Sequence, residues 1–232
     1  RRFRSSGASP GWCAAIWRRT PSWKLMDDFG RKAATWLPYW ENSQFVRTST
    51  PDLKVSLYNR PGKGVVAVIS NHGDLRRMVE WHDIPFHHVP VTPDNKAAAF
   101  AEIEALISRC GADVIVLARY MQIIPASLCE RYAGRIINIH HSFLPSFAGA
   151  RPYHQAHTRG VKLIGATCHY VTQDLDEGPI IEQDVIRVSH SDQIEELVRR
   201  GRDIEKAVLA RGLRYHLEDR VIVQENKTVV FA

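Results

Sequence analysis

The residues with the clearest chemical potential lie in the stretch NIHHSFLPSF, residues 138–147. It places an amide, two imidazoles and a hydroxyl within five residues, directly after a short apolar run. Side chains alternate along a strand, so Asn138 and His140 are expected to point to one side, and Ile137 and Ile139 to the other. An amide donor beside an imidazole can bind a carbonyl oxygen on which negative charge develops. The pair therefore indicates a clamp for such an oxygen.

Histidine is concentrated in this part of the chain. Five of the eleven histidines fall within 30 residues, namely His140, His141, His154, His157 and His169. The segment HYVTQDLDEG then adds carboxylates in a turn-rich loop, and an aspartate close to His140 would orient that ring and support its charge. A single histidine at a strand end often does no more than satisfy nearby backbone groups. The clustering favours a functional site over that plainer interpretation.

Two other kinds of site fit these residue types less well. The two histidines of PYHQAHT, together with the neighbouring histidines and Asp176, could bind a metal ion. Their spacing differs from that of an HExxH helix, and the four cysteines form no CxxC pair. A nucleophilic Ser142 would lack the GxSxG turn. We therefore expect neither a metal ion nor a covalent nucleophile.

The elements that must position these side chains follow from the apolar runs. Runs typical of strands cover residues 64–70, 86–91, 112–118 and 135–140. Segments with helical spacing lie between them, and the clearest begins with an Asp94 cap and stops at Gly111. Alternating strands and helices predict parallel pairing with right-handed crossovers. Ligands of such sheets bind beyond the carboxyl ends of the strands, where Asn138 and His140 lie.

The second half of the chain has a different pattern. Residues 163–172 and 179–188 predict two strands joined by the turn-rich QDLDEG, a hairpin that extends the sheet. Residues 191–217 predict a long amphipathic helix, and Asp192 and Glu195 form a capping box at its start. The final segment predicts two short strands around ENK.

Composition excludes several classes of protein. A chain of 232 residues with 44% hydrophobic and 24% charged residues is typical of a folded globular protein. No run approaches the roughly eighteen apolar residues of a membrane span, so we expect no membrane partner and a cytoplasmic location. The net charge of +6 comes without a basic stripe interleaved with aromatic residues, so no nucleic-acid partner is expected.

Residues 1–63 differ from the rest of the chain. They include RRFRSSGASPGW and TSTPDLKVSLYNRPGKG, and they show neither a helical period nor strand alternation. We interpret them as an atypical or poorly ordered N-terminal segment, and residues 64–232 as the folded domain.

The stretches RYMQI, RIINIHHSFLPSFAGARPYHQAHTRG and VKLIGATCHYVTQDLDEGPIIEQ resemble the folate-dependent formyltransferase-fold enzymes. The resemblance covers about residues 65–232. It implies a doubly wound, mostly parallel α/β sheet with flanking helices, and a formyltransferase-like catalytic domain over residues 64–232. Residues 1–63 contain no complete ACT domain, a small ligand-sensing module. They also lack the Ser/Gly and His-Cys-Leu loop that ends the family's first strand.

By matching position, the resemblance places the family's catalytic residues on Asn138, His140 and Asp176. The doubled histidine of NIHHSF and the following PYHQA resemble the hydrolase branch, the formyltetrahydrofolate deformylases. The implied substrate is 10-formyltetrahydrofolate, with no cofactor, and a homo-oligomer is expected. The resemblance implies a substrate pocket formed by Met121, Gln122 and Ile124 around the pteridine, and by Thr172 and Asp174 of the 172–177 loop.

The implied reaction is hydrolysis to formate and tetrahydrofolate, which supplies formate for purine biosynthesis and balances one-carbon pools. Asn138 and protonated His140 would hold the oxyanion, and Asp176 would orient the attacking water. The N-terminal segment leaves alternatives open. Residues 1–63 could supply a substitute strand to an active enzyme, or the chain could be a catalytically impaired folate-binding relative. Formyl transfer to an amine acceptor is a third alternative, although no Gly-x-x-Ser-Asn loop for an acceptor phosphate is found.

Overall fold

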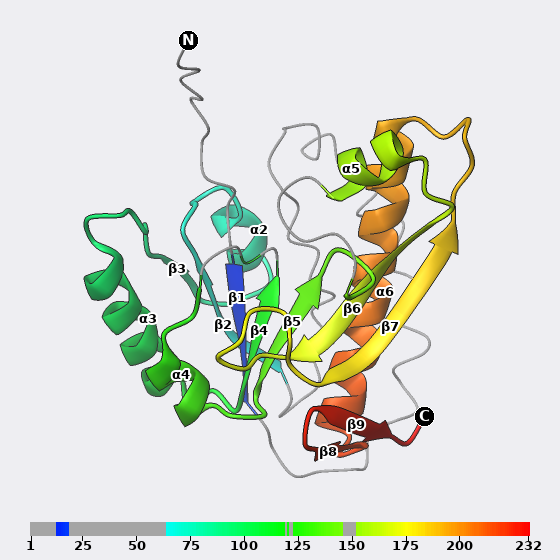
Figure 1. Ribbon diagram of the computed structural model, residues 1–232. Coiled ribbons are helices and arrows are strands. Elements are labelled where there is room, and N and C mark those ends of the chain that lie inside the picture. The colour runs from blue at the N-terminus through cyan, green and yellow to red at the C-terminus, as the bar shows by residue number, and fades with distance from the viewer. Residues whose placement is uncertain (1–12, 19–63, 119, 121–122, 146–151) are drawn as a thin grey trace.

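The computed structural model describes residues 13–18, 64–118, 120, 123–145 and 152–232, and for residues 13–18 it describes only the backbone. Within these residues, seven strands form one sheet in the order β3-β2-β1-β4-β5-β6-β7, and two more form a separate hairpin (Figure 1). The strands are β1 (Cys13–Arg18), β2 (Gly64–Ser70), β3 (Phe86–His88), β4 (Val114–Ala118), β5 (Ile136–His140), β6 (Leu163–Tyr170), β7 (Ile180–Arg187), β8 (Val221–Gln224) and β9 (Lys227–Val230). The helices are α2 (Arg76–Glu80), α3 (Lys96–Cys110), α4 (Ala126–Arg131), α5 (Pro152–Arg159) and α6 (Ile194–Leu217).

The strand directions confirm an α/β sheet, but fewer neighbouring strands pair in parallel than expected. Parallel pairing joins β2 to β3 and β4 to β5, as the alternation of strands and helices predicts. β1 runs antiparallel between β2 and β4, and β5, β6 and β7 pair antiparallel in succession. The connection between β6 and β7 is too short for a crossover, which explains their antiparallel pairing. Most of the described strands therefore run one way, while most neighbouring pairs are antiparallel.

Both faces of the sheet are covered by helices (Figure 1). Val68 and Ile137 belong to a core with the buried side of α6. Ile69 and Ile136, their alternating neighbours, belong to a second core with α3 and α4. Because successive strand residues face opposite sides, β2 and β5 contribute to both cores, and β2 is a nearly continuous apolar run.

β1 is the third of the seven strands in the sheet, between β2 and β4. Ala15 lies opposite Val68 of β2 on one side and Val116 of β4 on the other. The remainder of residues 1–63, which we expect to be atypical, lies outside the described residues. The strand next to β2 and β4 is thus an antiparallel one supplied by the N-terminal segment.

The helix ends confirm one sequence prediction and correct two. Gly111 ends α3 in the left-handed region at φ 60, as predicted. Asp94 is not the cap, because α3 begins after Asn95, whose Oδ1 accepts a hydrogen bond from the Thr92 amide at 2.7 Å. The helix α5 was not expected from the sequence pattern.

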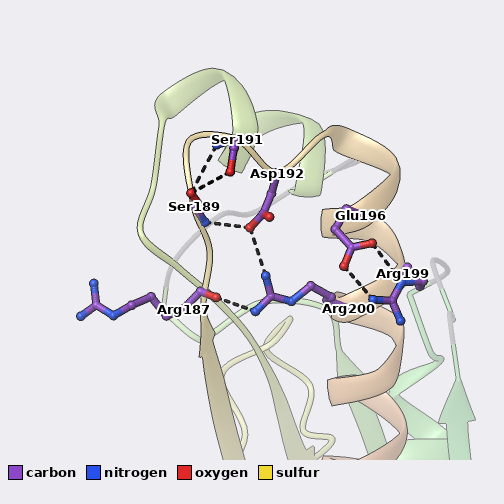
Figure 2. A network of polar contacts seen from close by, with 7 residues as sticks. All are labelled: Arg187, Ser189, Ser191, Asp192, Glu196, Arg199 and Arg200. Carbon is purple, nitrogen blue, oxygen red and sulfur yellow. Dashed lines mark hydrogen bonds and ion pairs between the residues drawn. The ribbon is translucent and has the colours of Figure 1, made fainter.

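The capping box predicted for α6 is wrong, because Asp192 is engaged elsewhere. Figure 2 shows Asp192 Oδ2 accepting hydrogen bonds from the Ser189 amide at 2.7 Å and from Arg200 Nη1 at 3.0 Å. Arg200 Nη2 also donates to the Arg187 carbonyl at 2.6 Å. The helix cap is Gln193, which makes no side-chain cap bond. The aspartate therefore ties the end of β7 to α6 instead of capping the helix.

None of the described helices is long and apolar enough to cross a bilayer.

Candidate active site

Asn138 and His140 lie on β5, and the sheet buries both of them. Their exposed fractions are 9% and 7%. Ile137 and Ile139 belong to the core on the α6 side, while Ile136 belongs to the opposite core. The predicted alternation is confirmed, so the amide and the imidazole share the face that α3 and α4 cover.

His169 on the neighbouring strand completes the polar cluster. It lies directly opposite Asn138 in the antiparallel pairing of β5 and β6, and only 2% of it is exposed. Its Nδ1 is 2.9 Å from the Tyr170 carbonyl oxygen, and its Nε2 is 3.2 Å from Asn138 Nδ2. Since a carbonyl only accepts, Nδ1 carries a proton, and Nε2 of the neutral ring accepts from the Asn138 amide.

Asp176 reaches the cluster from the loop between β6 and β7. Its Oδ1 lies 3.4 Å from His140 Nδ1 and 3.7 Å from His169 Nε2. Its backbone adopts φ 57, in the left-handed region that non-glycine residues seldom occupy. The structure therefore brings together the three residues Asn138, His140 and Asp176, and His169 contacts two of them.

His140 keeps Asp176 ionised. The hydrogen bond from His140 Nδ1 holds the pKa of the Asp176 carboxyl well below its ordinary value of 3.8, against the opposing effect of burial. Asp176 is thus a carboxylate at neutral pH.

Two atoms of the cluster are buried without a hydrogen-bond partner among the described residues: Asn138 Oδ1 and His140 Nε2. Buried polar atoms are almost always paired, because an unpaired one loses its water without compensation. Asp176 occupies Nδ1 of the His140 ring, so Nε2 is the atom that can meet a ligand. The arrangement offers an amide, an imidazole and a carboxylate to one polar group.

The residues expected to line a substrate pocket are less closely grouped. Thr172 and Asp174 are exposed on the loop that carries Asp176, and the Thr172 hydroxyl donates to the Asp174 carbonyl at 3.2 Å. Ile124 is half-buried and packs against the core on the α3 side. Met121 and Gln122 lie outside the described residues.

The other histidines of the predicted cluster are divided between two places. The His141 ring stacks on His140, with centroids 4.9 Å apart and the planes 18° from parallel. His154 and His157 are exposed on α5. Among the described residues, no three His, Cys, Asp or Glu side chains are grouped so that they could hold a metal ion.

The role of His169 is not evident from the sequence alone. The sequence feature that could have pointed to His169 is its place in the predicted strand 163–172. The register in which that strand pairs with its neighbour is not specified by the sequence. Only the pairing with β5 places His169 beside Asn138.

Comparison with known proteins identifies close relatives. Formyltetrahydrofolate deformylase of Bacillus subtilis is 57% identical over 167 residues, which are 72% of this chain and 56% of that protein. A crystal structure of a formyltetrahydrofolate deformylase from Pseudomonas syringae pv. tomato is 71% identical, with a TM-score of 0.71, over 72% of this chain and 56% of that one. The chain therefore spans little more than half the length of these deformylases.

More distant relatives share the fold. Glycinamide ribonucleotide transformylase 1 from Symbiobacterium toebii is 30% identical, with a TM-score of 0.66, over 72% of this chain and 81% of that one. The sequence model described as Formyl transferase matches residues 49–213, well over half of the chain. The chain thus belongs to the formyl transferase family.

Proposed function

We propose that this chain hydrolyses 10-formyltetrahydrofolate to formate and tetrahydrofolate. The observation that carries the proposal is the cluster of Asn138, His140 and Asp176, with two buried polar atoms that have no partner among the described residues. Identities of 57% and 71% with the deformylases, against 30% with a glycinamide ribonucleotide transformylase, support water as the formyl acceptor.

The first step is attack of water on the formyl carbon. The water oxygen forms a bond to that carbon, and the carbonyl electron pair moves to the formyl oxygen. Asn138 Nδ2 has one hydrogen engaged by His169, and its second hydrogen can bind the developing oxyanion. Protonated His140 donates to the same oxygen from Nε2. Removal of one such donor from an oxyanion site typically costs about 100- to 1000-fold in turnover.

Asp176 has two roles in this proposal. Its Oδ1 faces His140 Nδ1, which orients the ring and stabilises its positive charge. That arrangement leaves Oδ2 as the oxygen that can accept a hydrogen bond from the attacking water. A carboxylate with a lowered pKa remains an acceptor throughout the neutral pH range.

The second step breaks the bond between the formyl carbon and N10. The tetrahedral intermediate collapses, its carbonyl re-forms, and formate leaves. The attacking water loses two protons: one passes to N10, and the other is released when the formic acid ionises to formate, so the proton count balances. Neither a metal ion nor a covalent intermediate is required by this sequence of steps.

The proposed substrate contacts are Met121, Gln122 and Ile124 around the pteridine, and Thr172 and Asp174 beside it. The position of Thr172 and Asp174 on the loop of Asp176 supports this part of the proposal, because one loop would then contact the substrate and carry the carboxylate. A homo-oligomer in the cytoplasm is also part of the proposal. The exposed cross-strand pair of Ile222 and Val229 offers an apolar contact surface.

The test is formate release from 10-formyltetrahydrofolate by the purified chain, with and without a chelator, and with no amine acceptor. We expect release that resists the chelator and disappears in His140→Ala. Release that requires an amine acceptor would instead identify a transferase. No release from a folded chain that still binds tetrahydrofolate would identify an impaired relative.

A further inference from the structure

The C-terminal hairpin lies outside the part of the chain that the family model matches, yet it contacts the loop of Asp176. The family match ends at residue 213, and the hairpin comprises β8 and β9. Figure 1 shows the hairpin beside the C-terminal end of α6. Asn226 Nδ2 donates to the Glu177 carbonyl at 2.9 Å, and Thr228 Oγ1 donates to the Ile180 carbonyl at 2.5 Å. Both acceptors are backbone atoms within four residues after Asp176.

The loop needs such support because its backbone is unusual. Asp176 adopts φ 57, which costs free energy for any residue with a side chain unless the surrounding structure holds it. Two residues later, Gly178 lies so close to the Tyr170 carbonyl that a Cβ atom would overlap it. The segment after Asp176 is therefore held against β6 from inside and by the hairpin from outside.

The start of the same loop is anchored separately. Gln173 Nε2 donates to Glu130 Oε1 at 3.0 Å, which ties the loop to the helix α4. A cavity of about 310 Å³ lies between α4, this part of the loop and the hairpin residues Val223 and Glu225. Beside this cavity, the hydrogen bonds of Asn226 and Thr228 connect the hairpin to the segment that follows Asp176.

We propose that Asn226 and Thr228 are positioning residues that hold the Asp176 loop in its reactive geometry. They donate to the two ends of the segment 177–180, which fixes the backbone leaving Asp176 and so the direction of its carboxylate toward His140. The inference rests on the proposed deformylase activity, although its structural part can be tested without it.

The experiment compares the double variant Asn226→Ala/Thr228→Val with a matched control on the same hairpin. Gln224 and Lys227 form the neighbouring cross-strand pair and are both exposed, so Gln224→Ala/Lys227→Ala is the control. Loss of two hydrogen bonds of ordinary strength is expected to lower kcat roughly tenfold, with KM changed less than twofold. The control and the conservative variant Thr228→Ser, which keeps the hydroxyl, are expected to retain the kcat of the unaltered chain.

Hydrogen exchange of the amides in residues 173–178 provides the second readout. It is expected to be roughly tenfold faster in the double variant and unchanged in the control, at equal Tm. Unchanged exchange and kcat in the double variant would overturn the inference, as would equal effects in the control. If the unaltered chain releases no formate, the deformylase proposal fails, and the exchange readout alone then decides whether Asn226 and Thr228 hold the loop.

Discussion

The orientation of the Asn138 amide depends on His169, and two replacements of His169 separate that role from burial. His169→Gln keeps an oxygen near the position of Nε2, where it can accept from Asn138 Nδ2. His169→Asn keeps an N–H near the position of Nδ1 for the Tyr170 carbonyl, and loses the acceptor for Asn138. Both replacements remove the ring near Asp176, and they differ in two contacts: only Gln keeps the acceptor for Asn138, and only Asn keeps the donor to the Tyr170 carbonyl.

The expected size follows from the burial of these groups. Without its acceptor, a donor hydrogen of Asn138 is left unpaired in a site where only 9% of the residue is exposed. Leaving a buried donor unpaired costs about 1–3 kcal/mol, which the amide avoids by turning away from the oxyanion position. At about 1.4 kcal/mol per tenfold change, kcat of His169→Asn is expected to fall roughly 5- to 140-fold below that of His169→Gln.

The assay is formate release under saturating 10-formyltetrahydrofolate, with KM determined alongside kcat. KM is expected to change less than twofold, because the amide acts on the transition state more than on the bound substrate. Equal kcat values for the two variants, or a faster His169→Asn, would refute the reasoning that Nε2 is the acceptor for Asn138.

Three further predictions concern the same cluster and the packing around it. Asn138→Ala should lower kcat roughly 100-fold or more through loss of an oxyanion donor, and a loss below tenfold would contradict that role. The lowered pKa of Asp176 means that its ionised form stabilises the fold fully above the ordinary pKa of 3.8, and that this contribution is lost as pH falls below it. The free energy of unfolding should therefore be higher for the unaltered chain than for Asp176→Asn at pH 7, and this difference should be smaller at pH 3. A difference that stays the same at both pH values in urea titrations would exclude this linkage. Gly212→Ala should destabilise the fold by roughly 1–3 kcal/mol, because its Cβ would lie 2.5 Å from Cys168 Sγ, and an unchanged urea midpoint would show that α6 can shift away.

Much of the sheet could be predicted because its signals are local. The apolar runs of β2 and β4 reflect burial on both faces, and Gly111 ends α3 because glycine adopts the left-handed region readily. The shared direction of Asn138 and His140 follows from the two-residue period of a strand. Each of these predictions depends only on residues close together in the chain.

The errors arose where several groups compete for one side chain or for one helix position. Asp192 has the right position for a capping box, but Ser189 and Arg200 bind its carboxylate. The parallel pairing expected for most of the sheet does not hold around β1, because local sequence does not specify which neighbours a strand meets or in which sense.

The sequence by itself determined the α/β class of this chain, most of its strands and helices, and the residue types of the candidate site. Tertiary structure alone decided that His169 lies opposite Asn138 and that Asp176 reaches His140. It also decided that the C-terminal hairpin contacts the loop that carries Asp176. The physical reason is the range of the interactions. Periodicity and turn preferences act over a few residues, whereas strand register and loop docking are set by hydrogen bonds between groups that meet only in the folded chain.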